Sequence, residues 1–205
     1  SWIYGNDESM PIMLGVTGTN GKTSTVHLQD GIVQQLGIRS GMSSSAHRHI
    51  NGDVITARLT TPESSELHAL IAYMKEQGVE MFALEVSVQA IVRHRVDGVI
   101  YDVSGFTNLQ YDHMDDFSDM TEYLEGKLAM FNSSRARRAV VSLDTTAGRT
   151  VLERADIPVT TVATPEIAED AELAASAQWT ARMLREGINE TQMELIGPDG
   201  QHLVT

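Results

Sequence analysis

The chain has 205 residues, of which 41% are hydrophobic, and 28 acidic against 15 basic side chains give it a formal charge of −13. This length leaves room for one domain of good size, or one domain and part of another. The charge argues against a nucleic-acid partner, and the absence of cysteine excludes disulfides and thiolate metal sites and fits a reducing compartment. No apolar run is long enough to span a bilayer, so we expect a cytoplasmic protein with no membrane partner.

The first part of the chain predicts a strand, a glycine-rich turn and two helices. The apolar run PIMLGV, residues 11–16, predicts a buried strand, and the loop TGTNGKT follows it. A helix over about 23–36 is predicted to end at Gly37. After a polar connection rich in serine and histidine, residues 60–78 predict a second helix with Pro62 in its first turn.

The remaining residues continue the alternation of strands and helices. Apolar runs predict strands over residues 79–86, 99–106, 139–143 and 157–163. The pattern predicts an α/β fold with a mostly parallel sheet, helices on both faces and a P-loop-like nucleotide-binding site. From about residue 170, short alternating runs around the turn GPDG predict a small antiparallel appendage. The chain stops within this pattern, so we expect a truncated piece of a longer protein.

Polar residues of chemical interest follow several of the predicted strands. They are the loop over 17–23, Glu85, the loop over 107–113 and Asp144. Because ligands of open α/β sheets bind at the carboxyl ends of the strands, these residues are expected at one edge. Asp144 is expected either to approach a nucleotide there or to cap the next helix.

A lysine in the segment 107–131 stands on an apolar helical face. Asp119 is predicted to cap a helix, with Glu122 three residues later. The inward stripe of this helix comprises Met120, Tyr123, Leu124, Lys127 and Phe131. Burial would lower the pKa of the Lys127 amine and favour its neutral form. The alternative is a lysine that reaches water past Leu128 or pairs with Glu122 or Glu125.

The loop GTNGKT, residues 18–23, predicts a phosphate site. Glycines allow backbone N–H groups to surround phosphate oxygens at a helix N-terminus, and Lys22 would reach the terminal phosphates. Thr23 would offer its hydroxyl to Mg²⁺. The spacing differs from G-x-x-x-x-G-K-[ST], because the residue five before Gly21 is Val16. A shorter variety of nucleotide loop is therefore predicted.

The loop and four later motifs together resemble the Mur ligase family, and most of all its UDP-N-acetylmuramoyl-tripeptide synthetases. Those motifs, in family order, are TTPES (60–64), LEVSVQAIVRHRVDG (84–98), FTNLQYDHMDDFSDMTEYLEGKLAMF (106–131) and VVSLDTTAGR (140–149). The resemblance implies an ATP-dependent ligase of peptidoglycan synthesis, which joins a UDP-N-acetylmuramoyl-peptide carboxylate to an amino acid through an acyl-phosphate. It also implies that residues 1–205 form the central ATPase domain. The amino-terminal uridine-nucleotide domain and the carboxy-terminal amino-acid domain would be missing domains of the same polypeptide.

The resemblance implies a role for each matched residue, with ATP and Mg²⁺ as cofactors. Lys22, Glu85, His113 and Lys127 would be catalytic. Metal ligands would be Thr23 and Glu85 for one Mg²⁺, His113 for a second, and Lys127 as a carbamate formed with CO₂. The nucleotide would contact Gly18, Thr19, Asn20, Gly21, Lys22, Thr23, Ser24, Asn108 and Asp144. Without the resemblance, Glu85 could equally be a salt-bridge partner, and His113 would more often be structural.

The substrate side shows both matches and departures. Thr60, Thr61, Ser87 and Arg95 would contact the muramoyl-peptide, and the Arg95 fork suits a carboxylate or phosphate. Arg95 could instead be a surface residue. The departures are Val88 and Gln89, where the family has Ser-His, and Tyr111, where it has Arg. They leave the acceptor open.

Two further expectations follow. His47 and His49 have a spacing that suggests a metal site, although exposed loop histidines are the more common case. The alternatives to a muramoyl-peptide ligase are a folylpolyglutamate or poly-amino-acid type of ligase and a non-catalytic ATP-binding module. In each case the fragment alone is expected to bind Mg·ATP weakly or not at all and to form no amide.

Overall fold

One sheet runs through the part of the chain that the computed structural model describes, residues 10–112, 115–187 and 190–204. Its strands, in spatial order, are β11 (Gly200–Val204), β10 (Thr191–Gly197), β9 (Trp179–Glu186), β8 (Val159–Ala163), β7 (Ala139–Ser142), β6 (Val103–Phe106), β1 (Ile12–Thr17), β5 (Met81–Glu85), β2 (Ser40–Ser43), β3 (His47–Ile50) and β4 (Asp53–Thr56). Pairing is parallel from β2 to β9 across the middle and antiparallel at both ends. The predicted α/β fold with an antiparallel appendage is confirmed.

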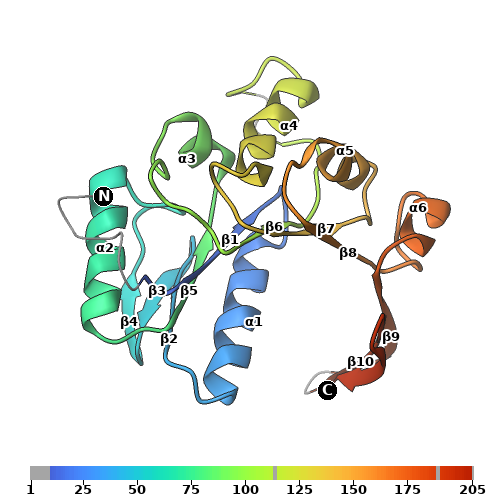
Figure 1. Cartoon of the computed structure of the whole chain (residues 1–205), viewed down its shortest axis with the longest axis horizontal. Helices are drawn as coiled ribbons and strands as arrows, with labels where there is room; N and C mark the ends of the chain where they lie inside the picture. The colour runs from blue at the N-terminus through green and yellow to red at the C-terminus, as the bar shows by residue number, and fades with distance from the viewer. Residues whose placement is uncertain (1–9, 113–114, 188–189, 205) are drawn as a thin grey trace.

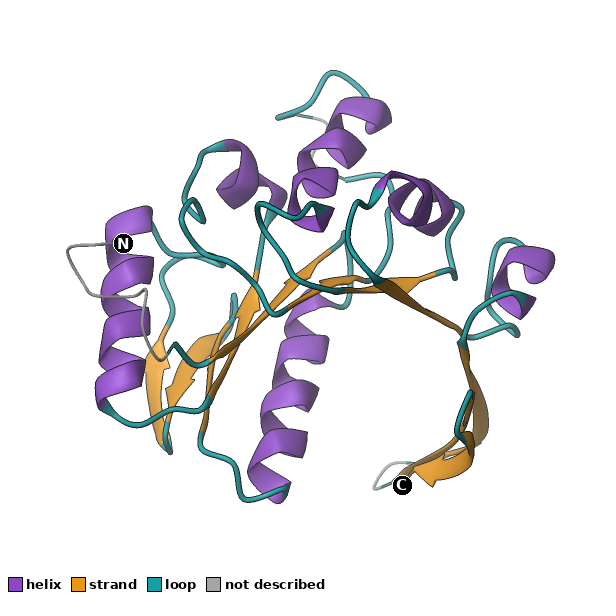
Figure 2. Cartoon of the chain, viewed as in Figure 1, coloured by secondary structure: helices purple, strands orange, loops and turns teal. Residues whose placement is uncertain are grey.

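Helices cover the two faces of the sheet unequally (Figure 1). They are α1 (Lys22–Gln35), α2 (Ser64–Glu76), α3 (Val88–Val92), α4 (Met120–Leu128), the 3₁₀ turn η1 (Ala129–Phe131), α5 (Ala147–Arg154) and α6 (Ala171–Ala175). Helices α2 to α5 lie on one face, whereas α1 lies on the other. Strands β9 and β10 curve toward the side on which α1 lies (Figure 2). None of the helices in the described ranges has the length and apolar character that crossing a membrane would require.

The core divides between these two faces. The larger cluster packs α2, α3, η1 and α5 on the sheet and includes Phe82, Leu84, Tyr101 and Phe131. The smaller cluster lies under α1 and comprises Val16, Val26, Met42 and Ala83. A parallel sheet buried on both faces explains why β1 and β5 read as continuous apolar runs.

The polar connection predicted between the first two helices is wrong. Residues 38–59 contain β2, β3 and β4, which extend the sheet beyond β5. Strand β2 reads SGMS and all four of its residues are buried, so it carries no apolar alternation that a sequence pattern could reveal. Pro62 also precedes its helix, because Glu63 is the N-cap of α2.

Parallel strands place their carboxyl ends at one edge of the sheet. Thr17 ends β1, Glu85 ends β5, Phe106 ends β6 and Ser142 ends β7. The phosphate loop, Glu85, the segment after β6 and Asp144 therefore gather at this edge, as predicted.

Candidate nucleotide- and metal-binding site

The glycine-rich loop joins β1 to α1 and leaves the helix N-terminus open. Gly21 occupies the N-cap with φ of 83°, and no side chain caps the first turn of α1. The N–H groups of that turn are therefore available to an anion. Gly18 has φ of 147°, and a Cβ added there would lie 1.9 Å from Oγ1 of Thr107, so the loop requires glycine at this position.

The segment after β6 holds the phosphate loop in place. The Thr19 N–H donates to the Asn108 carbonyl at 3.0 Å, and the Asn20 N–H donates to Oδ1 of Asn108 at 2.9 Å. Thr107 Oγ1 donates to the Asn20 carbonyl at 2.7 Å. Asn20 Nδ2 also donates to Oε1 of Gln110 at 2.7 Å. Asn108 thus orients the loop, while its nucleotide contact, implied by the resemblance, stays a prediction. Thr107 and Gln110 are partners that the sequence did not reveal.

Glu85 and Thr23 form the oxygen side of the site. Thr23 Oγ1 lies 2.9 Å from Oε2 of Glu85, and the Ser45 N–H donates to the same oxygen at 2.8 Å. Glu85 is 3% exposed, and both hydrogen-bond partners of its Oε2 are neutral groups. A hydroxyl and one buried carboxylate are hard oxygen donors that fit Mg²⁺ shared with phosphate. His113 lies outside the described residues, so its predicted metal role is not tested.

Lys127 reaches under the phosphate loop. It is 1% exposed, its Nζ donates to the Gly18 carbonyl at 2.9 Å, and Nζ lies 4.1 Å from the centroid of the Tyr123 ring. The prediction that Lys127 points inward is therefore confirmed. Tyr123 in turn places its hydroxyl 3.3 Å from Oγ1 of Thr19, a further loop contact.

The alternative partners predicted for Lys127 are engaged elsewhere. Glu122 accepts hydrogen bonds from the N–H and hydroxyl of Ser118 at 2.8 and 2.7 Å. Glu125 pairs with Arg154. Asp119 caps α4 as predicted, because its Oδ1 accepts from the N–H groups of the two residues after Met120. A surface ion pair or a lysine head in water is therefore wrong for Lys127.

Two amines share this loop and influence each other. The pKa of Lys127 is lowered from 10.5 to about 7, chiefly because burial disfavours the ammonium form and secondly because Lys22 is positive; Asp112 acts in the opposite direction. Burial also lowers the pKa of Lys22, against the carboxylates of Glu85 and Asp112, and its Nζ donates to the Thr19 carbonyl at 2.7 Å. Lys127 thus has a substantial neutral fraction near pH 7, and a neutral amine is a nucleophile.

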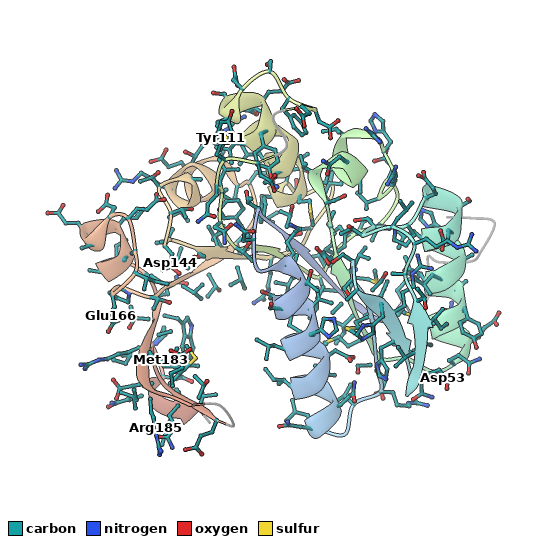
Figure 3. The ribbon with its side chains drawn as sticks, turned by 180° about the vertical axis from the view of Figure 1, so that it is seen from behind. Asp53, Tyr111, Asp144, Glu166, Met183 and Arg185 are labelled. Carbon is teal, nitrogen blue, oxygen red and sulfur yellow. The ribbon has the colours of Figure 1, made fainter. Side chains whose placement is uncertain are left out.

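A pocket of about 400 Å³ opens beside the loop, between α1 and the sheet. Asn20, Gly21, Asn108 and Asp144, four of the predicted nucleotide residues, line it. Asp144 lies by the sheet (Figure 3), and its Oδ1 accepts from the Thr164 N–H at 2.6 Å. The alternative role for Asp144 as a helix cap is wrong, because the N-cap of α5 is the residue two positions later. Ser24 lies exposed in the first turn of α1.

Two residues predicted on the substrate side bond to the protein itself. Thr61 is 1% exposed; its hydroxyl donates to the Glu85 carbonyl at 2.9 Å and accepts from the Ser87 N–H at 3.0 Å. Ser87 caps α3, since its hydroxyl accepts from the Ala90 N–H at 3.2 Å. Thr60, the residue before Thr61, is half-buried. The structure thus brings three predicted residues to the end of β5.

Arg95 and two of the departures from the family pattern lie in or just after α3, whereas the third, Tyr111, lies elsewhere (Figure 3). Arg95 forms an ion pair with Glu63 at 2.9 Å, so it is not a surface arginine without a partner. Val88 is 2% exposed and packs with Phe117 and Tyr123. Gln89 Nε2 donates to Oδ2 of Asp116 at 3.1 Å. Tyr111 is 81% exposed and lies toward α4 (Figure 3).

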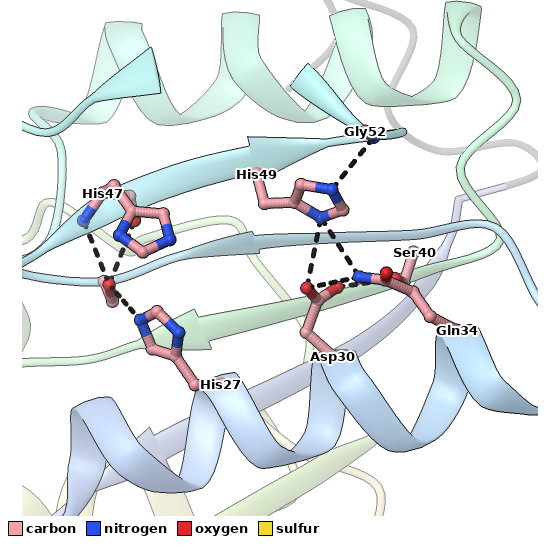
Figure 4. Close-up of polar contacts among 8 residues, drawn as sticks. His27, Asp30, Gln34, Ser40, His47, His49 and Gly52 are labelled. Carbon is pink, nitrogen blue, oxygen red and sulfur yellow. Dashed lines mark hydrogen bonds and ion pairs between the residues drawn. The ribbon is translucent and has the colours of Figure 1, made fainter. Parts of the chain in front are cut away.

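The histidines of residues 43–52 belong to a strand, so their assignment to an exposed loop is wrong. His47 and His49 both lie on β3 and face α1 (Figure 4). His49 Nδ1 is 3.1 Å from Oδ2 of buried Asp30, and the ring of His47 packs edge-on to that of His27 at 4.7 Å. Within the described ranges, no group of three or more histidine, aspartate or glutamate side chains could hold a metal on its own.

The parallel sheet, the uncapped helix behind a glycine-rich loop and the pocket beside it define an α/β domain of the phosphate-loop class. Residues 16–202 match the model of the Mur ligase middle domain, and the chain belongs to the Mur ligase family.

Curated relatives agree with this assignment. The chain is 46% identical over 205 residues to the UDP-N-acetylmuramyl-tripeptide synthetase of Leifsonia xyli subsp. xyli, which covers all of this chain and 38% of that protein. It is 35% identical over 202 residues to the UDP-N-acetylmuramoyl-L-alanyl-D-glutamate–2,6-diaminopimelate ligase of Streptomyces avermitilis, covering 98% of this chain and 38% of the relative. The chain therefore spans 38% of the length of these two relatives.

Solved structures share the fold. A UDP-N-acetylmuramoyl-L-alanyl-D-glutamate–2,6-diaminopimelate ligase superposes with a TM-score of 0.85 at 20% identity, over 100% of this chain and 41% of its own. A Mycobacterium tuberculosis folylpolyglutamate synthase superposes with a TM-score of 0.71 at 19% identity, over 98% of this chain and 51% of its own. At these identities the likeness establishes the fold alone.

Proposed function

We propose that this chain is the ATP-using domain of a ligase that joins a UDP-N-acetylmuramoyl-peptide carboxylate to an amino acid in peptidoglycan synthesis. The observation that carries the proposal is a buried amine under a phosphate loop: Lys127 contacts the Gly18 carbonyl, and Thr23 and Glu85 meet at the other side of the same loop. The 46% identity to a tripeptide synthetase supports the substrate class. The proposed cellular location is the cytoplasm.

The residues of this chain divide the work of binding ATP. The open N–H groups of the first turn of α1 would hold phosphate oxygens, and Lys22 would neutralise negative charge on the terminal phosphate. Thr23 and Glu85 would hold Mg²⁺, with His113 at a second ion; when bound, the metal neutralises charge that develops on phosphoryl oxygens. Asn20, Asn108 and Asp144 would line the nucleotide pocket.

The proposed reaction proceeds in two displacements. An oxygen of the substrate carboxylate attacks the γ-phosphorus, the bond to ADP breaks and an acyl-phosphate forms. The amine of the amino acid then attacks the acyl carbon, inorganic phosphate leaves and the amine loses a proton. This chain would supply electrostatic stabilisation and positioning, which are the main protein contributions to phosphoryl transfer.

Lys127 would act as a carbamate. The lone pair of its neutral amine forms a bond to the carbon of CO₂, one C=O electron pair moves to oxygen, and a proton leaves to water. The product is an anion with carboxylate-like oxygens. The low exposure of Lys127 and its pKa of about 7 favour this chemistry, because both increase the neutral fraction of the amine at physiological pH.

The test uses the polypeptide encoded by the complete reading frame. It is incubated with Mg·ATP, UDP-N-acetylmuramoyl-L-alanyl-D-glutamate and single amino acids, and the products are identified by mass spectrometry while phosphate release is followed. We expect an amide product and phosphate release that requires both acceptor and amino acid. Phosphate release with a folate acceptor only would show a folylpolyglutamate-type ligase instead. ATP binding without any ligation would show a non-catalytic ATP-binding module. The chain of 205 residues alone should form no amide.

A further inference from the structure

Two ties connect the loop before α2 to the segment around α3. The first tie is buried: the Thr61 hydroxyl bonds both the Glu85 carbonyl and the Ser87 N–H, at 2.9 and 3.0 Å. With 1% of Thr61 exposed, solvent has no access to exchange these bonds. This tie is a fixed part of the fold.

The second tie is open to solvent. Nη2 of Arg95 lies 2.9 Å from Oε1 of Glu63, and the Glu63 side chain is 58% exposed against 15% for Arg95. The exposed Glu63 carboxylate is well solvated when it leaves, whereas Arg95, which is only 15% exposed, needs another anion in its place. Glu63 can therefore leave Arg95 at small cost when a second acidic group replaces it.

The two partners are held to different degrees. The Arg95 N–H donates to the Ala90 carbonyl at 2.9 Å, and the preceding His94 adopts φ of 58° with its Nδ1 3.0 Å from Oδ2 of Asp97. The backbone turn that presents Arg95 is thus defined by its own contacts. Glu63 is the N-cap of α2 but makes no side-chain capping bond. Movement of the Glu63 carboxylate away from Arg95 therefore breaks no capping hydrogen bond of α2.

From these contacts we infer that Glu63 is an internal stand-in for an acidic group of the acceptor substrate, and that it occupies Arg95 until that group displaces it. The inference deepens the proposed function and rests on it. A guanidinium presents a fork that binds a carboxylate through two parallel hydrogen bonds, which is stronger and more directional than one ion-pair contact. An acidic substrate can therefore replace Glu63, whereas a neutral one gains too little to do so.

The test is the KM of the complete-reading-frame ligase for UDP-N-acetylmuramoyl-L-alanyl-D-glutamate. In Glu63→Gln the competing carboxylate is absent, so the KM should fall about two- to fivefold, the range expected for removing a competitor whose carboxylate is exposed to solvent. Arg95→Gln should raise the KM, and Glu63→Gln should give no gain when added to Arg95→Gln. The KM for ATP should not follow these changes.

Glu80→Gln is the matched control. Glu80 forms an ion pair with Arg39 at 3.3 Å, at the amino end of β5. The Glu80 side chain is 54% exposed, close to the 58% of Glu63, although Arg39 is more exposed than Arg95. Glu80→Gln should leave the KM for the muramoyl substrate unchanged. Melting curves of all variants establish that each is folded.

The outcomes separate the two levels of the argument. An unchanged KM in Glu63→Gln, or a rise similar to that of Arg95→Gln, would show that Glu63 merely supports the arginine and would overturn the inference. Failure of the unmodified protein to form any amide with this acceptor would overturn the proposed function instead.

Discussion

The Nζ of Lys127 donates a hydrogen bond of 2.9 Å to the carbonyl oxygen of Gly18 and so joins helix α4 to the phosphate loop across 109 residues of sequence. The same amine lies over the ring of Tyr123, whose hydroxyl contacts Thr19 of the loop. A change in the charge of this one side chain therefore directly alters the electrostatic environment of the backbone that would bind ATP.

Burial of the Lys127 amine makes stability depend on pH. Its pKa is about 7 in the fold and 10.5 in an ordinary environment, so the unfolded chain binds more protons between these values and stability rises with pH across that window. The destabilising effect is complete below pH 7 and is lost as pH rises toward 10.5. In CO₂-free buffer, the stability of Lys127→Met relative to the unmodified chain should fall by about 2–3 kcal/mol between pH 6 and pH 9. Urea unfolding at a series of pH values measures this difference in unfolding free energy between the two proteins. A difference that does not change with pH would contradict the lowered pKa of Lys127.

Two glycines, one in the phosphate loop and one inside α1, should respond in opposite ways to substitution by alanine. At Gly18 a Cβ meets Thr107 at 1.9 Å and φ is 147°, so Gly18→Ala should destabilise the fold by about 2–4 kcal/mol. At Gly31, inside α1, nothing lies within 4 Å of the added Cβ, and Gly31→Ala should stabilise by about 0.5–1 kcal/mol. Thermal and urea denaturation of both variants check the pair, and equal effects would show that the loop geometry is misassigned.

Thr61 is expected to matter through its hydroxyl rather than its methyl group. Thr61→Val keeps the shape but leaves the Glu85 carbonyl and the Ser87 N–H without this partner, which should cost about 2–4 kcal/mol. Thr61→Ser retains both bonds and should cost less than half as much. Denaturant unfolding measures the stability of the two variants. Similar losses of stability in both would indicate that packing, and not the two hydrogen bonds of the hydroxyl, is important.

The sequence revealed those features that depend on residues close together along the chain. The Asp119 cap, the inward face of α4 and the stops at Gly37 and Gly78, with φ of 76° and 70°, follow from local pattern and are confirmed. The glycine-rich loop was likewise recognisable because strand, loop and helix are contiguous.

Features that depend on distant segments could not be predicted in this way. Strand β2 is built of small residues and becomes buried only because β5 and β3 flank it. The contact of Ser45 with Glu85 joins residues 40 positions apart, and Arg95 finds Glu63 only once α2 and α3 have packed. Helix α3 has five residues, too short to produce a periodic signal.

Activity should depend on an anion at position 127. In the complete-reading-frame ligase, Lys127→Ala should reduce ATP-dependent amide formation by about a hundredfold or more, because a group that positions charge at the phosphates is lost. Added formate or acetate should restore part of this activity by entering the space left by the side chain. Full activity of the alanine variant without any added carboxylate would contradict the role assigned to Lys127.

The carbamate itself can be observed by ¹³C NMR of this chain with ¹³C-bicarbonate near pH 8. The sequence contains three lysines, Lys22, Lys75 and Lys127, so assignment by substitution is simple. Besides the carbamate of the amino-terminal amine, which is also partly neutral near pH 8, we expect one lysine carbamate resonance that survives in Lys75→Met and disappears in Lys127→Met. A spectrum without a lysine carbamate resonance, or one in which that resonance persists in Lys127→Met, would contradict the central claim that this buried amine completes the ATP site as an anion.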